Sequence, residues 1–290
     1  MNLPTTAHAI LAHYFYQGEA RPQGSLTPDE WEAGLDAYGP RLIPAHEWID
    51  RALAGKSKDE VMVSFDDGLR EALTFALPAL DKRGLTACWN IYTGPLVGVP
   101  NNLERWRWLR NFGFGGVEGF YTAWHEVEGP YNWRPSQDYL ADRLYLTKDD
   151  KHFRYWRNTI VPTEYEKTML ELEARSSSRF DSSQHWLSFF DIHDLYADGH
   201  VIGFHTHSHP TNMARLSIEQ QALEYATSKG ILELCLERPV TVMAHPCDSW
   251  TEDGIKWLQA NGVRLAWGGT MAGEAPWHTP RWSTGNWRLS

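Results

Sequence analysis

Three short apolar runs in this sequence end directly in side chains that carry chemistry. The runs and the residues that follow them are 61–65 before Asp66, 201–204 before His205, and 239–244 before His245. Apolar runs of four to eight residues are typical of buried strands, and polar groups at the carboxyl ends of parallel strands meet at one edge of the sheet. The pattern predicts an α/β protein, either a barrel or an open parallel sheet, with its active site at that edge.

The first two runs together predict a metal site. Asp66 and Asp67 are adjacent carboxylates, which repel each other unless a cation or a shared proton makes use of both. An ordinary polar turn is the alternative, because Asp-Asp-Gly is also good turn chemistry. The second run is followed by three histidines at alternate positions, the first and last being His205 and His209. One Asp with two His is the open three-ligand set of a catalytic metal.

The spacing of the remaining elements supports a strand–helix alternation. Thr27 and Ser217 stand where helix caps are expected, and a helical stretch separates the strand at 61–65 from the strand at 86–92. Such a unit is a right-handed crossover. An opening strand at 9–16 carries His13 toward the predicted site, although a partly buried position with a hydrogen bond to backbone is somewhat favoured.

The motifs resemble those of polysaccharide deacetylases, carbohydrate esterase family 4. The matching stretches are Ser-Phe-Asp-Asp-Gly at 64–68, His-Thr-His-Ser-His-Pro at 205–210 and Ala-His-Pro at 244–246. The resemblance covers about residues 5–97 and 186–290. It implies a distorted (β/α)7 TIM-like barrel with a helical insertion, and a metal-dependent hydrolase that removes an N-acetyl or related N-acyl group from a sugar.

The resemblance also implies roles for individual residues. In that family the first Asp of the pair is the general base and the second binds the metal with the two outer histidines. Carried over to this chain, Asp66 is the base, and Asp67, His205 and His209 are the metal ligands. His207 falls at a variable position of its motif. Zn²⁺ is the expected ion, with Co²⁺, Ni²⁺ or Mn²⁺ as alternatives.

Two later motifs depart from the family pattern. Ala244 stands where many members have an Arg that orients the base, and His245 replaces an aromatic residue. The family's general acid is a histidine near the chain end, so His278 and His245 are both candidates. The Pro-Arg step that includes Arg281 is similar to one found in a branch of the family, and we expect Arg281 and Trp282 to contact the substrate.

The stretch 98–185 interrupts the strand–helix alternation. It is rich in Trp, Tyr, Arg and Glu and is expected to be mostly helix and irregular loop. Structureless loops of more than about 15 residues are uncommon in compact domains, so we interpret 98–185 as a helical cap over the metal within one catalytic domain spanning 1–290. Its tryptophans fit either sugar stacking or ordinary core packing, and packing is favoured for any single one. These are Trp106, Trp108, Trp124, Trp133 and Trp156.

Charge and composition restrict the partners. The net charge of −10 argues against nucleic acid, which is bound through clustered Lys and Arg. No window approaches the length and hydropathy of a membrane span, and the start lacks a secretory signal pattern. Cys88, Cys235 and Cys247 are odd in number and far apart, which suits free thiols in a reducing cytoplasm. The expected partner is therefore a small acyl-sugar in the cytoplasm, such as a surface-glycan precursor or an aminosugar, while the oligomeric state stays open.

Two alternatives to sugar deacetylation remain at the level of sequence. One keeps the metal and changes the bond, giving a deformylase or amidase on a non-sugar amide. The other is a degenerate carbohydrate-binding protein, which the substitution at Ala244 allows. The intact Asp66 argues against a pure binding protein, because binding alone does not need a general base.

Overall fold

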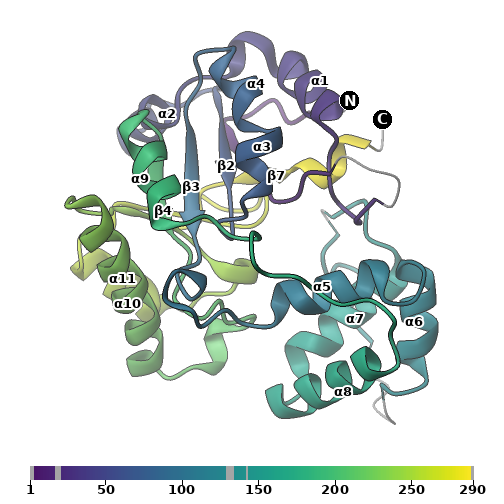
Figure 1. The fold of residues 1–290 in the computed structure, drawn as a ribbon. Helices are drawn as coiled ribbons and strands as arrows, with labels where there is room; N and C mark the ends of the chain where they lie inside the picture. The colour runs from purple at the N-terminus through teal and green to yellow at the C-terminus, as the bar shows by residue number, and fades with distance from the viewer. Residues whose placement is uncertain (1–2, 17–20, 129–133, 142, 289–290) are drawn as a thin grey trace.

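The computed structural model describes residues 3–16, 21–128, 134–141 and 143–288, and its central feature is one parallel sheet. Seven strands run in the spatial order β6-β5-β4-β3-β2-β1-β7, and every neighbouring pair is parallel (Figure 1). The strands are β1 (His8–Ala12), β2 (Val61–Phe65), β3 (Ala87–Ile91), β4 (Val201–Phe204), β5 (Val242–Ala244), β6 (Leu265–Trp267) and β7 (Arg281–Ser283).

The two edges of the sheet approach each other through the segment that leads into β7. Thr279 donates from its backbone nitrogen to the carbonyl of Ala266 at 3.0 Å, and Gly268 donates to the carbonyl of Thr279 at 3.0 Å. The segment therefore lies against β6 just before the chain joins β1 as β7. This curl confirms the predicted distorted (β/α)7 barrel.

Helices connect the strands and cover the barrel. They are α1 (Pro28–Tyr38), α2 (Ala45–Leu53), α3 (Glu71–Phe75), α4 (Leu77–Asp81), α9 (Phe189–Ala197), α10 (Ile218–Leu236) and α11 (Glu252–Ala260). Short 3₁₀ turns are η1 (Gly39–Arg41), η2 (Pro95–Val97), η3 (Met213–Arg215), η4 (Pro246–Asp248) and η5 (Thr284–Arg288). The predicted caps Thr27 and Ser217 both form complete capping boxes, with Glu30 and Gln220 as the reciprocal partners.

The barrel core explains why the strand sequences are nearly uniformly apolar. All five residues of β2 and all five of β3 are buried, because helices cover the sheet. Phe65 and Trp89 pack with ring centroids 4.4 Å apart, and Trp31 from α1 joins them at 5.9 Å from Phe65. This packing holds the carboxyl ends of neighbouring strands at fixed spacing.

The insertion between β3 and β4 builds its own apolar cluster. Its helices are α5 (Leu103–Phe112), α6 (Val117–His125), α7 (Lys148–Thr159) and α8 (Pro162–Ala174), which form a group beside the barrel in Figure 1. Trp106, Trp124 and Trp156 are buried in this cluster with Phe153, so core packing accounts for these three tryptophans. Trp108 is 37% exposed, and Trp133 lies outside the described residues.

The three cysteines are free thiols, with Cys88 buried and Cys247 exposed. Within the described ranges, no helix combines the length and apolar character needed to cross a bilayer.

Candidate active site

The ends of β2 and β4 bring an aspartate and two histidines together. Asp67 Oδ1 lies 3.3 Å from Nε2 of His205 and 3.2 Å from Nε2 of His209. The three side chains are buried, and one ligand atom from each lies within 4.8 Å of the others. Asp67 Oδ1 and His209 Nδ1 are buried without a hydrogen-bond partner in the described structure. An orphaned carboxylate oxygen facing two imidazole nitrogens is a donor set that fits a divalent transition metal.

Unusual backbone conformations aim these side chains. Asp67 has φ of 70° directly after β2, and His209 has φ of 53°. Asp and His tolerate this left-handed region better than most residues, and such conformations cluster at functional sites. His205 follows β4 and donates from Nδ1 to the carbonyl of Ala244 at 2.8 Å. That bond leaves Nε2 as the free acceptor turned toward Asp67, as a metal-binding histidine requires.

Asp66 sits beside this cluster in a different environment. Its Oδ1 accepts from Arg281 Nη1 at 2.7 Å and from Asn90 Nδ2 at 2.8 Å, while its Oδ2 lies 3.9 Å from His13 Nε2. Burial alone would raise the pKa of Asp66, but the charge of Arg281, the strongest opposing influence, helps to lower it to about 2. Asp66 is therefore held ionised at neutral pH, with Oδ2 as its unengaged oxygen.

The carboxylate of Asp67 is also held ionised. Burial opposes its charge, but the neighbouring imidazoles of His205 and His209 keep the pKa of Asp67 well below its usual range. The two adjacent aspartates thus have different partners, one an arginine and an amide, the other two imidazoles. This difference separates their chemistry despite their adjacency in sequence.

Two residues of this arrangement were not assigned by sequence analysis. Asn90 lies on β3, between β2 and β4, and its only sequence signal is a polar residue inside an apolar strand. His13 follows β1 immediately and is partly buried as expected, with 28% of its side chain exposed, and it lines the pocket. Its position at the end of a strand was the signal that could have found it, as for Asp66 and His205.

The other predicted site residues lie in different places. Arg281 comes from β7, is only 2% exposed, and donates a hydrogen bond to the predicted base Asp66. His245 lines the pocket, donates from Nε2 to the carbonyl of Trp277 at 3.1 Å, and has its pKa lowered by burial to about 3. His278 packs against Trp250 with ring centroids 3.8 Å apart and is not among the described residues that line the pocket.

Trp282 also lies apart from the pocket. It follows Arg281 on β7, so its side chain points to the opposite face of the strand. There it packs against the barrel core. The structure therefore brings Asp66, Asp67, His205, His209, His245 and Arg281 to one pocket, and leaves His278 and Trp282 outside it.

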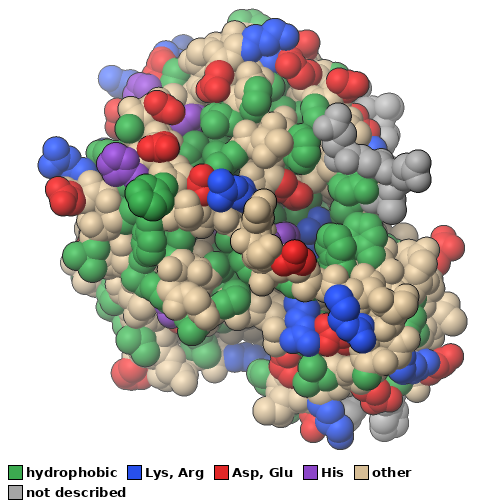
Figure 2. Space-filling view, in the orientation of Figure 1, with side chains coloured by type: hydrophobic (Ala, Val, Ile, Leu, Met, Phe, Trp, Pro, Cys, Tyr) green, Lys and Arg blue, Asp and Glu red, His purple; other side chains and the backbone are tan. Residues whose placement is uncertain are grey.

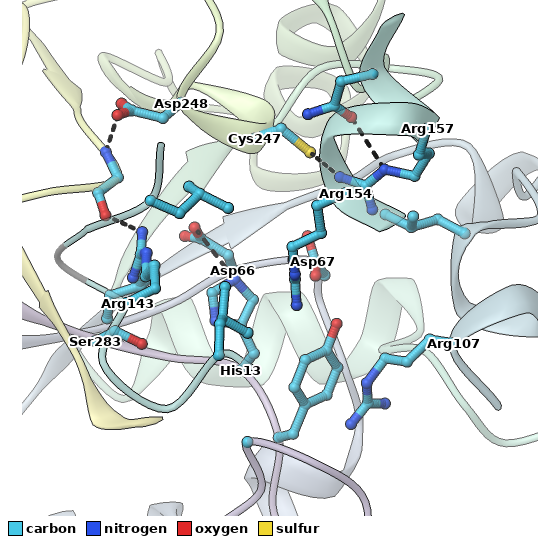
Figure 3. A pocket seen from close by; sticks show the side chains of 18 of the residues that line it. His13, Asp66, Asp67, Arg107, Arg143, Arg154, Arg157, Cys247, Asp248 and Ser283 are labelled. Atoms are coloured by element: carbon cyan, nitrogen blue, oxygen red, sulfur yellow. Dashed lines mark hydrogen bonds and ion pairs between the residues drawn. The ribbon is translucent and has the colours of Figure 1, made fainter. Parts of the chain in front are cut away.

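The pocket lies between the strand ends and the insertion. Its wall includes Asp248 from the barrel side and Arg107 and Arg154 from the stretch 98–185 (Figure 3). Tyr14 and Tyr139 also line it. Figure 2 shows a hollow between the barrel and the helical insertion, with histidine and cationic side chains visible inside it. A substrate in this pocket would contact both parts of the chain.

The chain thus forms a curled parallel barrel with an Asp–His–His cluster at its carboxyl edge. The family model described as polysaccharide deacetylase matches residues 189–266. That stretch contains β4, both histidines of the cluster and β5. No curated protein matches the chain.

Solved structures of deacetylases share the fold over nearly the whole chain. A deacetylase of Streptococcus pyogenes, PplD in complex with acetate, has a TM-score of 0.60 and 13% identity, covering 97% of this chain and 93% of its own. IcaB from Ammonifex degensii has a TM-score of 0.59 and 15% identity, covering 98% and 94%. A de-N-acetylase from Aggregatibacter actinomycetemcomitans has a TM-score of 0.55 and 10% identity, covering 95% and 93%.

These findings confirm the resemblance that the motifs predicted. The family model matches the stretch that carries the histidine motif, and the solved deacetylases share the fold of the whole chain.

Proposed function

We propose that this protein is a metal-dependent hydrolase that removes an N-acetyl, or related N-acyl, group from an aminosugar. The observation that carries the proposal is the buried Asp67–His205–His209 cluster beside an aspartate that a buried arginine keeps ionised. A pure sugar-binding protein would not need that second carboxylate, whereas hydrolysis needs a base next to the metal.

The ligand set suits zinc. Asp67, His205 and His209 would hold the ion through one oxygen and two nitrogens, which leaves coordination positions for water and substrate. A divalent metal bound there would supply Lewis-acid chemistry, polarising the amide carbonyl and lowering the pKa of a bound water. The backbone carbonyl of Ala244 fixes the tautomer of His205 for this role.

Asp66 is the proposed general base. Its Oδ1 is occupied by Arg281 and Asn90, so the water's proton goes to Oδ2. Many members of the family orient the base with an arginine at the position that Ala244 occupies here. In this chain Arg281, on a different strand, orients Asp66 instead. Its guanidinium keeps Asp66 charged and fixes the rotation of the carboxylate.

His13 is the residue best placed to protonate the departing amine. Burial lowers the pKa of His13, while the charges of Asp67 and Asp66 act against that shift. A neutral His13 facing Asp66 Oδ2 can take up the proton that Asp66 removes from water and deliver it to the leaving nitrogen. His245 is less suited, because its Nε2 is bonded to a backbone carbonyl.

We also propose that 1–290 is one catalytic domain in which 98–185 covers the metal site. Residues of the insertion and of the strand ends line the same pocket, which supports this role. The substrate we expect is a small acyl-sugar in the cytoplasm, such as a glycan precursor.

Three variants test the proposal by acyl release and metal content. Asp66→Asn should abolish turnover of N-acetylglucosamine-containing substrates while the bound metal, measured by mass spectrometry, is retained. His205→Ala should lose both. The matched control is His207→Ala, which alters the same motif outside the ligand cluster and should keep both. Full activity in Asp66→Asn would refute the proposal, and release of formate instead of acetate would identify a deformylase.

A further inference from the structure

Six arginines line the pocket of the metal cluster. They are Arg107, Arg110, Arg143, Arg154, Arg157 and Arg281. Three aspartates and no lysine accompany them in the described lining, although the chain as a whole carries a net charge of −10. Positive charge is therefore concentrated at this one cavity.

All but one of these arginines come from the insertion. Arg107 and Arg110 stand three residues apart on α5, and Arg154 and Arg157 stand three apart on α7. This spacing places each pair on one face of its helix. Figure 3 shows the side chains of Arg107, Arg143, Arg154 and Arg157 arranged around Asp66 and Asp67. Only Arg281 comes from the barrel, and it is engaged by Asp66.

Internal partners account for some of these charges. Arg107 pairs with Glu104 at 3.2 Å and lies over the ring of Tyr14. Arg157 donates to Asn158 Oδ1 at 3.0 Å. Arg143 donates to the backbone carbonyl of Gly269. These contacts hold the three guanidinium groups in place at the pocket wall.

Arg110 and Arg154 form no hydrogen bond to a carboxylate among the described residues. Arg110 is only 6% exposed, and the Nε atoms of both are buried without a hydrogen-bond partner among the described residues. Asp150 is near enough to interact with both charges. Its oxygens, however, accept hydrogen bonds from Tyr121, Gln23 and Thr147. A buried guanidinium donor that makes no hydrogen bond is costly, so the pair of unsatisfied Nε groups indicates a bound anion.

We propose that Arg110 and Arg154 form an anion subsite, and that the substrate is an acylated aminosugar carrying an oxyanion group, either phosphate or carboxylate. This inference rests on the proposed function and names its substrate class. Guanidinium groups match the geometry of phosphate and carboxylate with two parallel hydrogen bonds, which explains the use of arginine rather than lysine. The anion is held by the insertion while the acyl group lies at the strand ends.

Binding of simple anions tests the subsite without relying on catalysis. Calorimetry on the metal-loaded full-length protein would use inorganic pyrophosphate as the phosphate probe and glucuronate as the carboxylate probe. Arg110→Gln and Arg154→Gln should each raise the Kd of whichever probe binds more tightly by about 10- to 100-fold, which is the contribution expected of one charge-assisted hydrogen-bonding group. Arg154→Lys should recover part of the loss. The matched control is Arg105→Gln, since Arg105 also lies on α5 but pairs with Glu173 outside the pocket lining.

The metal itself must be excluded as the anion site. In His209→Ala, which removes a proposed ligand, binding of the probe should persist within about threefold, whereas metal-bound anion would be lost with the metal. Thermal melting of each arginine variant shows whether the fold is intact. Absence of binding by both probes, or equal weakening in Arg105→Gln, would overturn the subsite.

Acyl release then separates the two proposals. N-acetylglucosamine 1-phosphate, or the matching uronate, should be deacetylated with a higher kcat/KM than neutral N-acetylglucosamine, and Arg110→Gln should remove that advantage. Equal turnover of neutral and anionic sugars would overturn the inference and leave the deacetylase function standing. Anion binding that depends on these arginines, with no acyl release from any sugar, would overturn the deacetylase function and leave the anion subsite standing.

Discussion

The ion pair between Arg281 and Asp66 yields a quantitative prediction. Arg281 Nη1 lies 2.7 Å from Asp66 Oδ1, and the side chains are 1% and 3% exposed. At an effective dielectric constant of about 20, two unit charges at that distance attract by about 6 kcal/mol. Desolvation of both ions offsets much of this attraction, and breaking such a buried pair typically costs about 3–5 kcal/mol. Arg281→Met should therefore lower the free energy of unfolding by about that amount.

The effect should depend on the charge of Asp66. In Arg281→Met the carboxylate is left buried without its cation, whereas in the double variant with Asp66→Asn no lone charge remains. The double variant should be more stable than the sum of the single effects predicts, with a coupling energy of about 2 kcal/mol or more. Urea unfolding of all four proteins in the presence of a chelator measures this cycle without a contribution from bound metal. A coupling energy below about 0.5 kcal/mol would refute this account of how the base is kept ionised.

Two further predictions concern the core and the support of the base. His8 is fully buried, and burial lowers its pKa to about 4. The unfolded chain therefore takes up a proton below about pH 6.5 that the folded chain does not, and the free energy of unfolding should fall by up to about 3 kcal/mol from pH 6.5 to pH 4. Urea unfolding across this range should show a weaker pH dependence for His8→Gln, and the same pH dependence in both proteins would show that other groups cause it. Gly203→Ala would place Cβ 2.5 Å from Asn90 Oδ1 and would disturb the amide that holds Asp66. We expect kcat to fall, the metal content to be retained, and the free energy of unfolding to drop by about 1–3 kcal/mol. The control is Gly230→Ala, whose Cβ meets nothing within 4 Å and which should gain up to about 1 kcal/mol; equal kcat in the two variants would argue against a role for Asn90.

Sequence reasoning could predict those parts of the structure that local pattern controls. The apolar run at 61–65 and its acidic end identified β2, and the cap at Ser217 identified the start of α10. The juxtaposition of Asp67 with His205 followed from one rule, that carboxyl ends of parallel strands meet. In each case neighbouring residues contain the information.

The parts that sequence missed depend on distant contacts. Arg281 reaches Asp66 because β7 pairs with β1 beside β2, an adjacency that no local pattern around Arg281 reveals. Trp282 was expected at the substrate, but the alternation of β7 turns it to the core once Arg281 faces the site. Asn90 looked like an isolated polar residue in a strand, and only the neighbouring strand explains it.

The central claim is that Asp67, His205 and His209 bind a metal ion at the strand ends, and anomalous diffraction from crystals grown with Zn²⁺ tests it most directly. The predicted result is a strong peak at the zinc edge about 2.0–2.2 Å from one oxygen of Asp67 and one nitrogen of each histidine. The described residues contain one other metal-competent group, His125, Glu128 and His152 in the insertion. A peak there with none at the strand ends, in crystals of active protein, would contradict the account.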